Sequence, residues 1–328
     1  MKAILTELIE HRSLSKDTAR QVLIDLASGK YNSSQTSAFM TVYMMRSITI
    51  DELQGFRDAM LELCIPVKLD VPAMDVCGTG GDGKNTFNIS TLSSFVVAAA
   101  GQPVAKHGNY GVSSVSGSSN VLEYFGYKFT NAIDELKRSL DRANICFMHA
   151  PLFHPAMKNV APIRKELGVK TFFNMLGPMV NPAFPKRQLV GVFSLELARQ
   201  YSYLYQQTDK DFVILHSLDG YDEISLTSEF KYFFNGGERI THPTEIGMPH
   251  LSQIDLKGGD TVEESAKIFM TILEGMGTAA QNAAVIANAG MALYCGHQKE
   301  GMPIAFAKAK ETLESGKALD CFKKLIEQ

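Results

Sequence analysis

The sequence predicts an α/β protein in two parts: a small all-helical N-terminal domain and a larger α/β domain with a mostly parallel central sheet. Three observations support this fold class. Residues 1–66 show helical patterns only. After a linker with two prolines, short apolar runs alternate with helical patterns, which is typical of a parallel sheet flanked by helices. The first of these runs leads into a glycine-rich loop, "GTGGDG". We therefore expect domains over 1–70 and 71–328.

The first domain is expected to be a bundle of short amphipathic helices. Ser15 can cap one helix, and Thr49 with Glu52 forms a capping box in front of another. Apolar residues in each segment recur on one helical face. Because such short helices bury little surface alone, we expect the bundle to pack on something further, for example a second copy of the chain.

The second domain contains six apolar runs that we predict as buried strands, at 73–77, 102–108, 145–151, 170–176, 188–194 and 211–217. Residues 229–243 predict a hairpin that turns at Asn235, Gly236 and Gly237. The C-terminal part shows helical patterns again, and one of its helices opens with a capping box of Thr261 and Glu264.

Composition excludes several function classes. The 328 residues carry 32 Lys and Arg against 35 Asp and Glu, a net charge of -3, so no general polyanion binder such as a nucleic-acid protein is expected. The five cysteines are scattered and lack zinc-site spacing, which indicates buried thiols in a reducing compartment. No apolar run reaches the ~18 residues of a membrane span. We expect a cytoplasmic protein with no membrane partner.

The glycine-rich loop matches two standard phosphate-binding patterns, and each match fails at one residue. A dinucleotide site needs an acid at the end of the next strand, where this chain has Lys106 and His107. A P-loop needs Ser or Thr where this chain has Asn85. Asp82 would repel a bare phosphate unless it accepts sugar hydroxyls or helps to hold a metal. The loop therefore favours a phosphorylated sugar, with magnesium.

Three further stretches carry candidate site residues. The serine-rich stretch after Lys106 follows a strand and precedes a helix, so it is a second candidate phosphate loop, although such stretches are also common linkers. The adjacent acids Asp222 and Glu223 suit a hydrated Mg²⁺, or a solvated turn. His154 lies among prolines, where a structural role is common, and Arg164 lies in a helical stretch, where a solvated face is the default.

Five motifs in their order along the chain resemble those of the anthranilate phosphoribosyltransferases, within the glycosyltransferase family that also contains the pyrimidine nucleoside phosphorylases. They are "GTGGDGKNTFNIST", "KHGN…SS…SGSSNVLE", "HAPLFHPAMK", "RKELGVKTFFNMLGPMVNPA" and "GYDEIS". The resemblance covers nearly the whole chain. It implies the nucleoside phosphorylase / phosphoribosyltransferase type of fold, with residues of about 160–185 returning to the helical domain, and a homodimer formed through that domain.

The resemblance also implies an activity: transfer of the phosphoribosyl group from phosphoribosyl pyrophosphate (PRPP) to the amine of anthranilate, which yields N-(5-phosphoribosyl)anthranilate and pyrophosphate on the way to tryptophan. Mg²⁺ would be the cofactor. The alternatives are pyrimidine nucleoside phosphorylase-like pentosyl transfer and a non-catalytic nucleic-acid-binding relative. Asp82 and the adjacent acids favour the pyrophosphate donor over free phosphate, and the acidic net charge disfavours nucleic acid.

Site residues follow from the resemblance position by position. The implied donor-binding residues are Gly78, Thr79, Gly80, Gly81, Asp82, Thr86, Asn88, Ile89, Ser90, Thr91, Lys106, His107, Gly108, Asn109, Ser113, Ser114 and Ser118. The implied anthranilate-binding residues are Gly78, Asn109, Arg164, His107, His154 and Pro178. Ser90, Asp222 and Glu223 are the implied magnesium ligands. No general base is assigned. The family often has KHGNR and SSKSGSAD in the second loop, where this chain has Tyr110, Val115 and Asn120.

Overall fold

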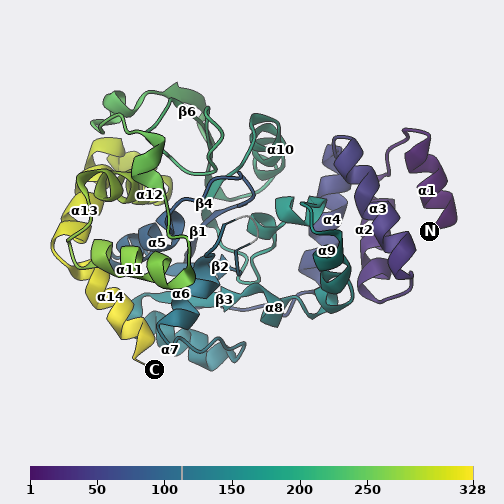
Figure 1. Cartoon of the computed structure of the whole chain (residues 1–328), viewed down its shortest axis with the longest axis horizontal. Coiled ribbons are helices and arrows are strands. Elements are labelled where there is room, and N and C mark those ends of the chain that lie inside the picture. Colours follow the sequence, from purple (N-terminus) through teal and green to yellow (C-terminus); the bar gives the residue numbers. More distant parts are fainter. Residues whose placement is uncertain (112–113, 328) are drawn as a thin grey trace. The chain divides into compact units, whose positions relative to one another are not determined.

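The chain forms two compact units in a computed structural model that describes residues 1–111 and 114–327. The helical unit consists of Met1–Val67 and Ala150–Phe184, and the α/β unit of Lys68–His149 and Pro185–Gln328. The helical unit thus includes a segment from the middle of the chain, which begins at Ala150 rather than near residue 160. Each unit can be followed by its labels in Figure 1.

The N-terminal part of the helical unit contains helices that start at the expected caps. They are α1 (Lys2–Ile9), α2 (Lys16–Ala27), α3 (Ser33–Met45) and α4 (Ile50–Leu63). The Ser15 side chain accepts a hydrogen bond from the Thr18 amide, and Thr49 and Glu52 form the expected capping box. Helices α2 and α4 touch at Gly55, where a Cβ atom would overlap with the Lys16 carbonyl, so only glycine allows this approach.

The returning segment completes the core of the helical unit. It contains α8 (Ala150–Phe153), α9 (Ala161–Leu167) and the 3₁₀ turns η1 (Pro155–Asn159), η2 (Phe172–Met175) and η3 (Gly177–Val180). Phe172 stacks on Phe56 with ring centroids 4.5 Å apart, and Phe39 and Tyr43 pack edge-on against both rings. These aromatic contacts explain why the segment belongs to this unit.

The predicted strand over 170–176 is wrong, because these residues form the turn η2. Asn174 Oδ1 accepts a hydrogen bond from the Thr171 amide, which closes the turn locally. The apolar residues of this run are buried by the aromatic core of the helical unit and not by a sheet. A short apolar run does not distinguish these two outcomes.

The α/β unit is built on a seven-stranded sheet in the order β3-β2-β1-β4-β5-β6-β7. The strands are β1 (Met74–Gly78), β2 (Val104–Gly108), β3 (Ile145–His149), β4 (Arg187–Gly191), β5 (Asp211–Ser217), β6 (Phe230–Phe234) and β7 (Gly237–Thr241). The first five are parallel, as expected. The expected hairpin is formed by β6 and β7, which pair antiparallel around residues 235–236.

Helices cover both faces of this sheet. They are α5 (Ile89–Ala99), α6 (Ser118–Tyr124), α7 (Ile133–Ala143), α10 (Leu195–Tyr205), α11 (Val262–Leu273), α12 (Ala279–Gly296), α13 (Met302–Glu314) and α14 (Lys317–Ile326), with the 3₁₀ turns η4 (Pro243–Ile246), η5 (Gln253–Leu256) and η6 (Gln298–Glu300). Helices α5 and α12 pack on each other on one face, whereas α10 lies over the other beside β5 (Figure 1). None of the described helices is long and apolar enough to cross a membrane.

One helix start in this unit differs from the expected capping box. Thr261 caps α11 by accepting from the Glu264 amide, as expected. The Glu264 carboxylate, however, accepts from the Asp260 amide, one residue earlier than in a standard box.

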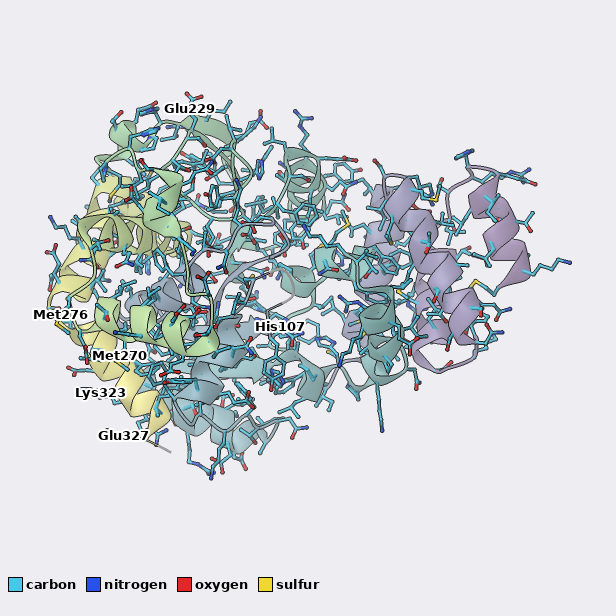
Figure 2. The ribbon with its side chains drawn as sticks, in the orientation of Figure 1. His107, Glu229, Met270, Met276, Lys323 and Glu327 are labelled. Atoms are coloured by element: carbon cyan, nitrogen blue, oxygen red, sulfur yellow. The ribbon has the colours of Figure 1, made fainter. Side chains whose placement is uncertain are left out.

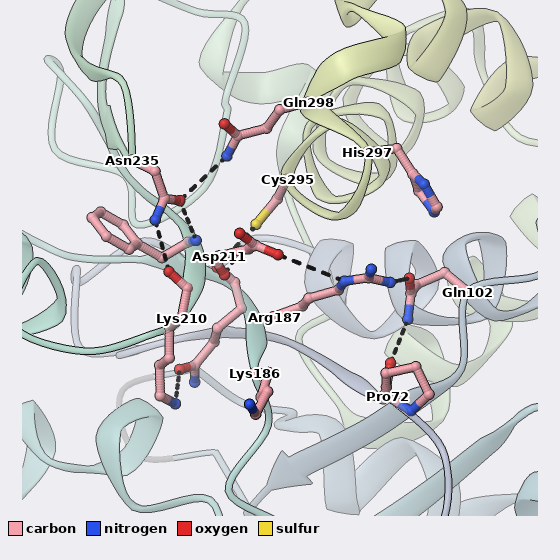
Figure 3. A network of polar contacts seen from close by, with 12 residues as sticks. Pro72, Gln102, Lys186, Arg187, Lys210, Asp211, Asn235, Cys295, His297 and Gln298 are labelled. Atoms are coloured by element: carbon pink, nitrogen blue, oxygen red, sulfur yellow. Dashed lines mark hydrogen bonds and ion pairs between the residues drawn. The ribbon is translucent and has the colours of Figure 1, made fainter.

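The amino ends of the strands are tied together by a polar network (Figure 3). Arg187 at the start of β4 donates to Gln102 Oε1 at 2.7 Å and lies 3.9 Å from the carboxylate of Asp211 at the start of β5. Asn235 accepts from the Phe212 amide and donates to the Lys210 carbonyl. In open α/β sheets ligands bind outside the carboxyl ends of the strands, which is the opposite edge of the sheet.

Candidate functional site

The glycine-rich loop leaves the sheet where its strand order reverses. From β1 the chain crosses to β2 and β3 on one side, and from β4 it continues to β5 on the other. A crevice outside the carboxyl ends at such a point is the usual ligand site of an open α/β sheet. The loop follows β1, and the acids Asp222 and Glu223 follow β5. The backbone is close here, because a Cβ on Gly191 at the end of β4 would overlap with the Asp222 carbonyl.

The conformation of the loop explains its glycines. Gly80, Gly81 and Gly83 have φ angles of +62°, +78° and +75°, which side-chain-bearing residues rarely adopt. Nothing lies within 4 Å of a Cβ built at Gly80 or Gly83, so backbone conformation and not crowding selects glycine there. The loop ends at the amino terminus of α5, whose free N–H groups favour an anion.

The two acids contact amides of this loop directly. The Asp222 carboxylate accepts from the Gly80 amide at 2.6 Å. The Glu223 carboxylate accepts from the Ser90 amide in the first turn of α5 at 3.0 Å, with Thr86 Oγ1 at 3.5 Å from its second oxygen. Gly80, Thr86 and Ser90 all belong to the expected donor-binding set. The two carboxylates therefore bond amides of the kind that are suited to phosphate oxygens.

The surroundings of the two acids raise their pKa values. Burial and the nearby Asp82 raise the pKa of Asp222 to about 8. Burial, Asp222 and Asp82 together raise the pKa of Glu223 well above its usual value. Such shifts mean that the ionised forms are unfavourable in the absence of a cation. A bound divalent cation would stabilise the ionised carboxylates and lower both pKa values.

Lys106, a candidate cation of the site, is turned toward the sheet. Its side chain is 2% exposed and its ammonium group donates to the Val76 carbonyl at 2.6 Å. Burial lowers the pKa of Lys106, against the attraction of Asp75 and Glu223. The charge of Lys106 therefore contributes to the electrostatic field of the site. Among the residues described, no direct ion pair joins it to Asp222 or Glu223.

Several polar atoms of the two loops are buried without a hydrogen-bond partner in the described part of the chain. They are Thr79 Oγ1, Asn88 Oδ1 and Ser116 Oγ. Buried polar atoms in folded proteins are nearly always paired, so a group of exceptions in one place needs an explanation. A polar ligand or ordered water at these loops is such an explanation.

The second loop, residues 108–118, follows the neighbouring strand β2 and contacts the first loop. Asn88 Nδ2, at the start of α5, donates to the Ser116 carbonyl at 3.0 Å. Gly108, Asn109, Ser114 and Ser118 lie in this second loop, whereas the expected donor residue Ser113 lies outside the described residues. His107, labelled in Figure 2, is buried at the end of β2, and its amide donates to Asp75. Ile89 and Thr91 are buried in the first turn of α5.

The oxygen-rich donor set suits magnesium. Ser90, Asp222 and Glu223 offer a hydroxyl and carboxylates, which are ligands that Mg²⁺ prefers and completes with water. The buried Asp82 Oδ2 and the raised pKa values of the two acids fit an additional positive charge at this place. Within residues 1–111 and 114–327, however, no three His, Cys, Asp or Glu side chains form a metal-binding group. The residues therefore fit a cation that retains several waters or shares ligands with a substrate.

The helical unit carries the expected acceptor residues Arg164, His154 and Pro178. Arg164 is not on a solvated face: its guanidinium lies 5.1 Å from the centre of the Phe173 ring and donates to Asn174 Oδ1 at 3.4 Å, and burial lowers its pKa. Burial lowers the pKa of His154 to about 4, despite backbone hydrogen bonds with Val180 and Met60 that favour the charged form.

Two asparagines were missed by the sequence analysis as parts of the site. Asn174 holds Arg164 from η2, and the only sequence signal for it is its position three residues after Thr171, as in a capping box. Asn120 bonds two amides of the second loop, as described below. Its signal is similar, because it lies three residues into the motif that starts α6.

The chain was compared with known proteins. It matches the glycosyl transferase family in both parts, the helical bundle domain over residues 2–64 and the a/b domain over 70–319. An anthranilate phosphoribosyltransferase of Christiangramia forsetii is 64% identical over 99% of this chain and 98% of its own length. One of Bacteroides thetaiotaomicron is 52% identical over 100% of this chain and 99% of its own length.

Solved structures agree in fold. The crystal structure of anthranilate phosphoribosyltransferase from Thermus thermophilus has a TM-score of 0.90 and 32% identity, and covers 98% of both chains. That of the Saccharomyces cerevisiae enzyme in complex with PRPP and Mg has a TM-score of 0.89 and 24% identity, and covers 98% of this chain and 96% of its own. Both have the fold described above.

Proposed function

The chain belongs to the glycosyl transferase family, among its anthranilate phosphoribosyltransferases. These enzymes transfer the phosphoribosyl group of PRPP to the amine of anthranilate, a step of tryptophan biosynthesis, and we propose how this chain performs the transfer. One observation carries the proposal for the site. Two adjacent acids bond the amides of a glycine loop at the switch point of the sheet. This arrangement suits a ligand that brings phosphates and a divalent cation together.

We assign the donor to the two loops of the α/β unit. In this proposal the amides of the first loop and of the start of α5 receive the pyrophosphate, and the second loop receives the remainder of the donor. The unpartnered Thr79, Asn88 and Ser116 atoms support this assignment, because sugar hydroxyls and phosphate oxygens supply the partners that they lack.

We assign Mg²⁺ to Asp222, Glu223 and Ser90. When bound, the ion neutralises pyrophosphate and makes it a better leaving group. The carboxylates that now hold the Gly80 and Ser90 amides would then have a cation to bind, so these amides would become free for phosphate oxygens. Asp82 lies close enough to both acids to raise their pKa values, so it adds to the negative field that attracts the ion.

We assign the carboxylate of anthranilate to Arg164. A planar guanidinium can grip a carboxylate through two parallel charge-assisted hydrogen bonds. The face of Phe173 and the oxygen of Asn174 hold the guanidinium, which lowers the entropy lost when the substrate binds. In the same proposal His154 and Pro178 of the helical unit supply neutral surface for the aromatic ring. Gly78, His107 and Asn109 are the acceptor residues that we assign in the α/β unit.

The transfer then needs little covalent help from the protein. The amine nitrogen forms a bond to the anomeric carbon as the bond from that carbon to the pyrophosphate oxygen breaks, and the amine proton leaves to solvent. Because pyrophosphate is already a good leaving group when its charge is neutralised, positioning and electrostatics supply the acceleration. We assign no general base.

Anthranilate fluorescence tests the function. It should fall when PRPP and Mg²⁺ are added to the chain, and remain constant if PRPP or Mg²⁺ is left out. A chain that instead cleaves pyrimidine nucleosides with inorganic phosphate, and leaves anthranilate fluorescence unchanged with PRPP, would contradict the proposal.

We further propose a homodimer through the helical unit and a cytoplasmic location. Ile9 of α1 is 68% exposed and Met45 at the end of α3 is 84% exposed, so this unit presents apolar side chains to a second copy. All five cysteines are buried free thiols, which suits a reducing compartment. Light scattering during gel filtration should give twice the chain mass, and Ile9→Lys with Met45→Lys should reduce it toward the monomer.

A further inference from the structure

The two ends of the second loop are in direct contact. The Asn109 carbonyl accepts from the Ser119 amide at 3.1 Å and from Ser118 Oγ at 3.4 Å. Gly117 lies against the backbone on the opposite side, because a Cβ there would fall 2.7 Å from the Asn109 carbonyl oxygen and overlap with the Gly111 amide nitrogen. Gly111 is equally crowded, with the Gly117 nitrogen 3.0 Å from its hypothetical Cβ. Both glycines are therefore required by close backbone approach.

One side chain holds this contact. Asn120 Oδ1 accepts from the Gly111 amide at 2.9 Å and from the Gly117 amide at 2.9 Å. The two amides come from opposite ends of the loop, so a single oxygen connects them. Asn120 is half-buried in the first turn of α6, where the helix fixes its backbone.

We propose that Asn120 is a positioning residue for the donor site, which acts by closing the neck of the second loop. This inference rests on the proposed function, because Asn109 and Ser118, which the neck brings together, are among the residues assigned to the substrates. If the Asn120 oxygen is removed, two amides lose their partner and the neck can open. Asn109 and Ser118 then lose their fixed spacing, although neither residue has changed.

The chemistry of the side chain explains why an amide suits this position. The oxygen of Asn has two lone pairs and can accept from two N–H groups at once. A carboxylate can do the same, in keeping with the Asp that the family often has at this position of the loop. Leu has a similar volume and no acceptor, and Ala removes both volume and acceptor.

The contact between the two loops provides an independent anchor. Asn88 holds the Ser116 carbonyl from the start of α5, and this bond does not involve Asn120. Loss of the Asn120 oxygen should therefore loosen the neck while the loop remains attached to α5. The expected defect is in substrate binding, with the fold of the unit preserved.

The test compares Asn120→Leu, Asn120→Ala and Asn120→Asp with the wild-type chain in the fluorescence assay. Asn120→Leu and Asn120→Ala should raise the KM for PRPP by about tenfold or more, with a smaller change in kcat. The reason is that misplaced binding groups weaken the contacts that they make. Asp should restore the KM to within about threefold of wild type, because it retains the acceptor. Calorimetric titration with PRPP and Mg²⁺, without anthranilate, should show the same order in affinity without turnover.

Tyr110→Phe is the matched control on the same loop. It removes only the hydroxyl that donates to Glu123 at 3.3 Å on the exposed side, and should change neither quantity by more than about twofold. If the Asn120→Leu variant does not fold, the Asn120→Ala variant provides the test. A wild-type KM for PRPP in both Asn120→Leu and Asn120→Ala would overturn the proposal. A KM in Asn120→Asp as high as that of Asn120→Leu would also overturn it. A wild-type chain without fluorescence change would instead overturn the proposed function, so the two failures are distinct.

Discussion

Two carboxylates buried in different units have opposite electrostatics. In the helical unit Glu52 is fully buried, and although burial alone would raise its pKa, hydrogen bonds from Arg46 and two backbone amides lower it. In the α/β unit Asp222 is 7% exposed, and burial together with Asp82 raises its pKa to about 8. Both side chains are buried, but Glu52 is bonded by the guanidinium of Arg46, whereas Asp222 has a second carboxylate, Asp82, as its neighbour.

This difference separates a structural acid from a functional one. Both oxygens of Glu52 accept hydrogen bonds within its unit, so its charge stabilises the fold. Asp222 and Glu223 accept from one loop amide each and face one another and Asp82, so their charges are costly until a cation arrives. Strongly perturbed acids at a ligand crevice are typical of functional sites.

The largest expected effect is on the functional pair. Asp222→Asn with Glu223→Gln should lower turnover by about 1000-fold, about 4 kcal/mol of transition-state stabilisation, because neutral amides are poor Mg²⁺ ligands. The Mg²⁺ dependence, titrated by anthranilate fluorescence, should become weak. Without metal, the double variant should unfold at the same or a higher temperature than wild type, since mutual repulsion is removed. A wild-type magnesium titration would show that the pair is a structural turn.

The structural acid should behave in the opposite way. Glu52→Gln places an NH₂ group where Arg46, Thr49 or Leu14 now donates, so one donor must face another donor. Breaking a buried pair costs about 3–5 kcal/mol, and Arg46 is partly exposed, so we expect a loss of about 3 kcal/mol in the free energy of unfolding. Urea unfolding measures it. An unchanged midpoint would mean that Glu52 contributes no net stability.

The next effect concerns Arg164, a buried cation of the helical unit that is held by an aromatic ring and an amide and lacks a described carboxylate partner. Arg164→Ala should lower kcat/KM for anthranilate by about 30- to 150-fold, about 2–3 kcal/mol, since its hydrogen bonds to a carboxylate are charge-assisted. Lys should rescue only part, because it lacks the planar fork. PRPP binding, measured by calorimetry, is the control. A change in kcat/KM below about threefold would exclude the carboxylate clamp.

The sequence was informative where chemistry is local. The glycine-rich loop after the first apolar strand was recognised from the sequence, and three of its glycines have φ above zero, a backbone that only glycine adopts freely. The capping residues predicted helix starts for the same reason, since a cap bonds an amide two or three residues away. The adjacent acids were already candidates for magnesium, or for a solvated turn, and the resemblance implied the magnesium role and a substrate role for Arg164.

Long-range contacts were not predictable in this way. Gly80 and Asp222 are bonded although 142 positions separate them, and no local pattern shows that an acid would occupy that amide. The apolar run at 170–176 was predicted as a strand because its aromatic partners, Phe39 and Phe56, lie far away in the sequence. Asn120 was recognised only as a departure from the family's loop, and Asn174 was given no role, because the importance of each depends on the two groups that it connects.

The smallest expected effect concerns His154, a buried side chain that is neutral at pH 7 because burial lowers its pKa. Burial lowers its folded pKa to about 4, below the value of about 6.5 expected in the unfolded chain. The unfolded state therefore binds a proton first as pH falls, and stability is lost from about pH 6.5 downward until the folded group titrates near 4. Between pH 7 and pH 5 the loss should be on the order of 1–2 kcal/mol. Glu52, whose folded pKa is lowered, loses its contribution only at more acidic pH.

The measurement must exclude Asp222, whose raised pKa has the opposite sign, because it makes the metal-free fold more stable as pH falls through the same range. Unfolding by urea is therefore followed in the Asp222→Asn, Glu223→Gln background, with and without His154→Asn. The free energy of unfolding should decline from pH 7 to pH 5 when His154 is present and decline less when Asn replaces it. If the free energy of unfolding changes with pH in the same way with and without His154→Asn, the pKa of His154 is not lowered by the fold.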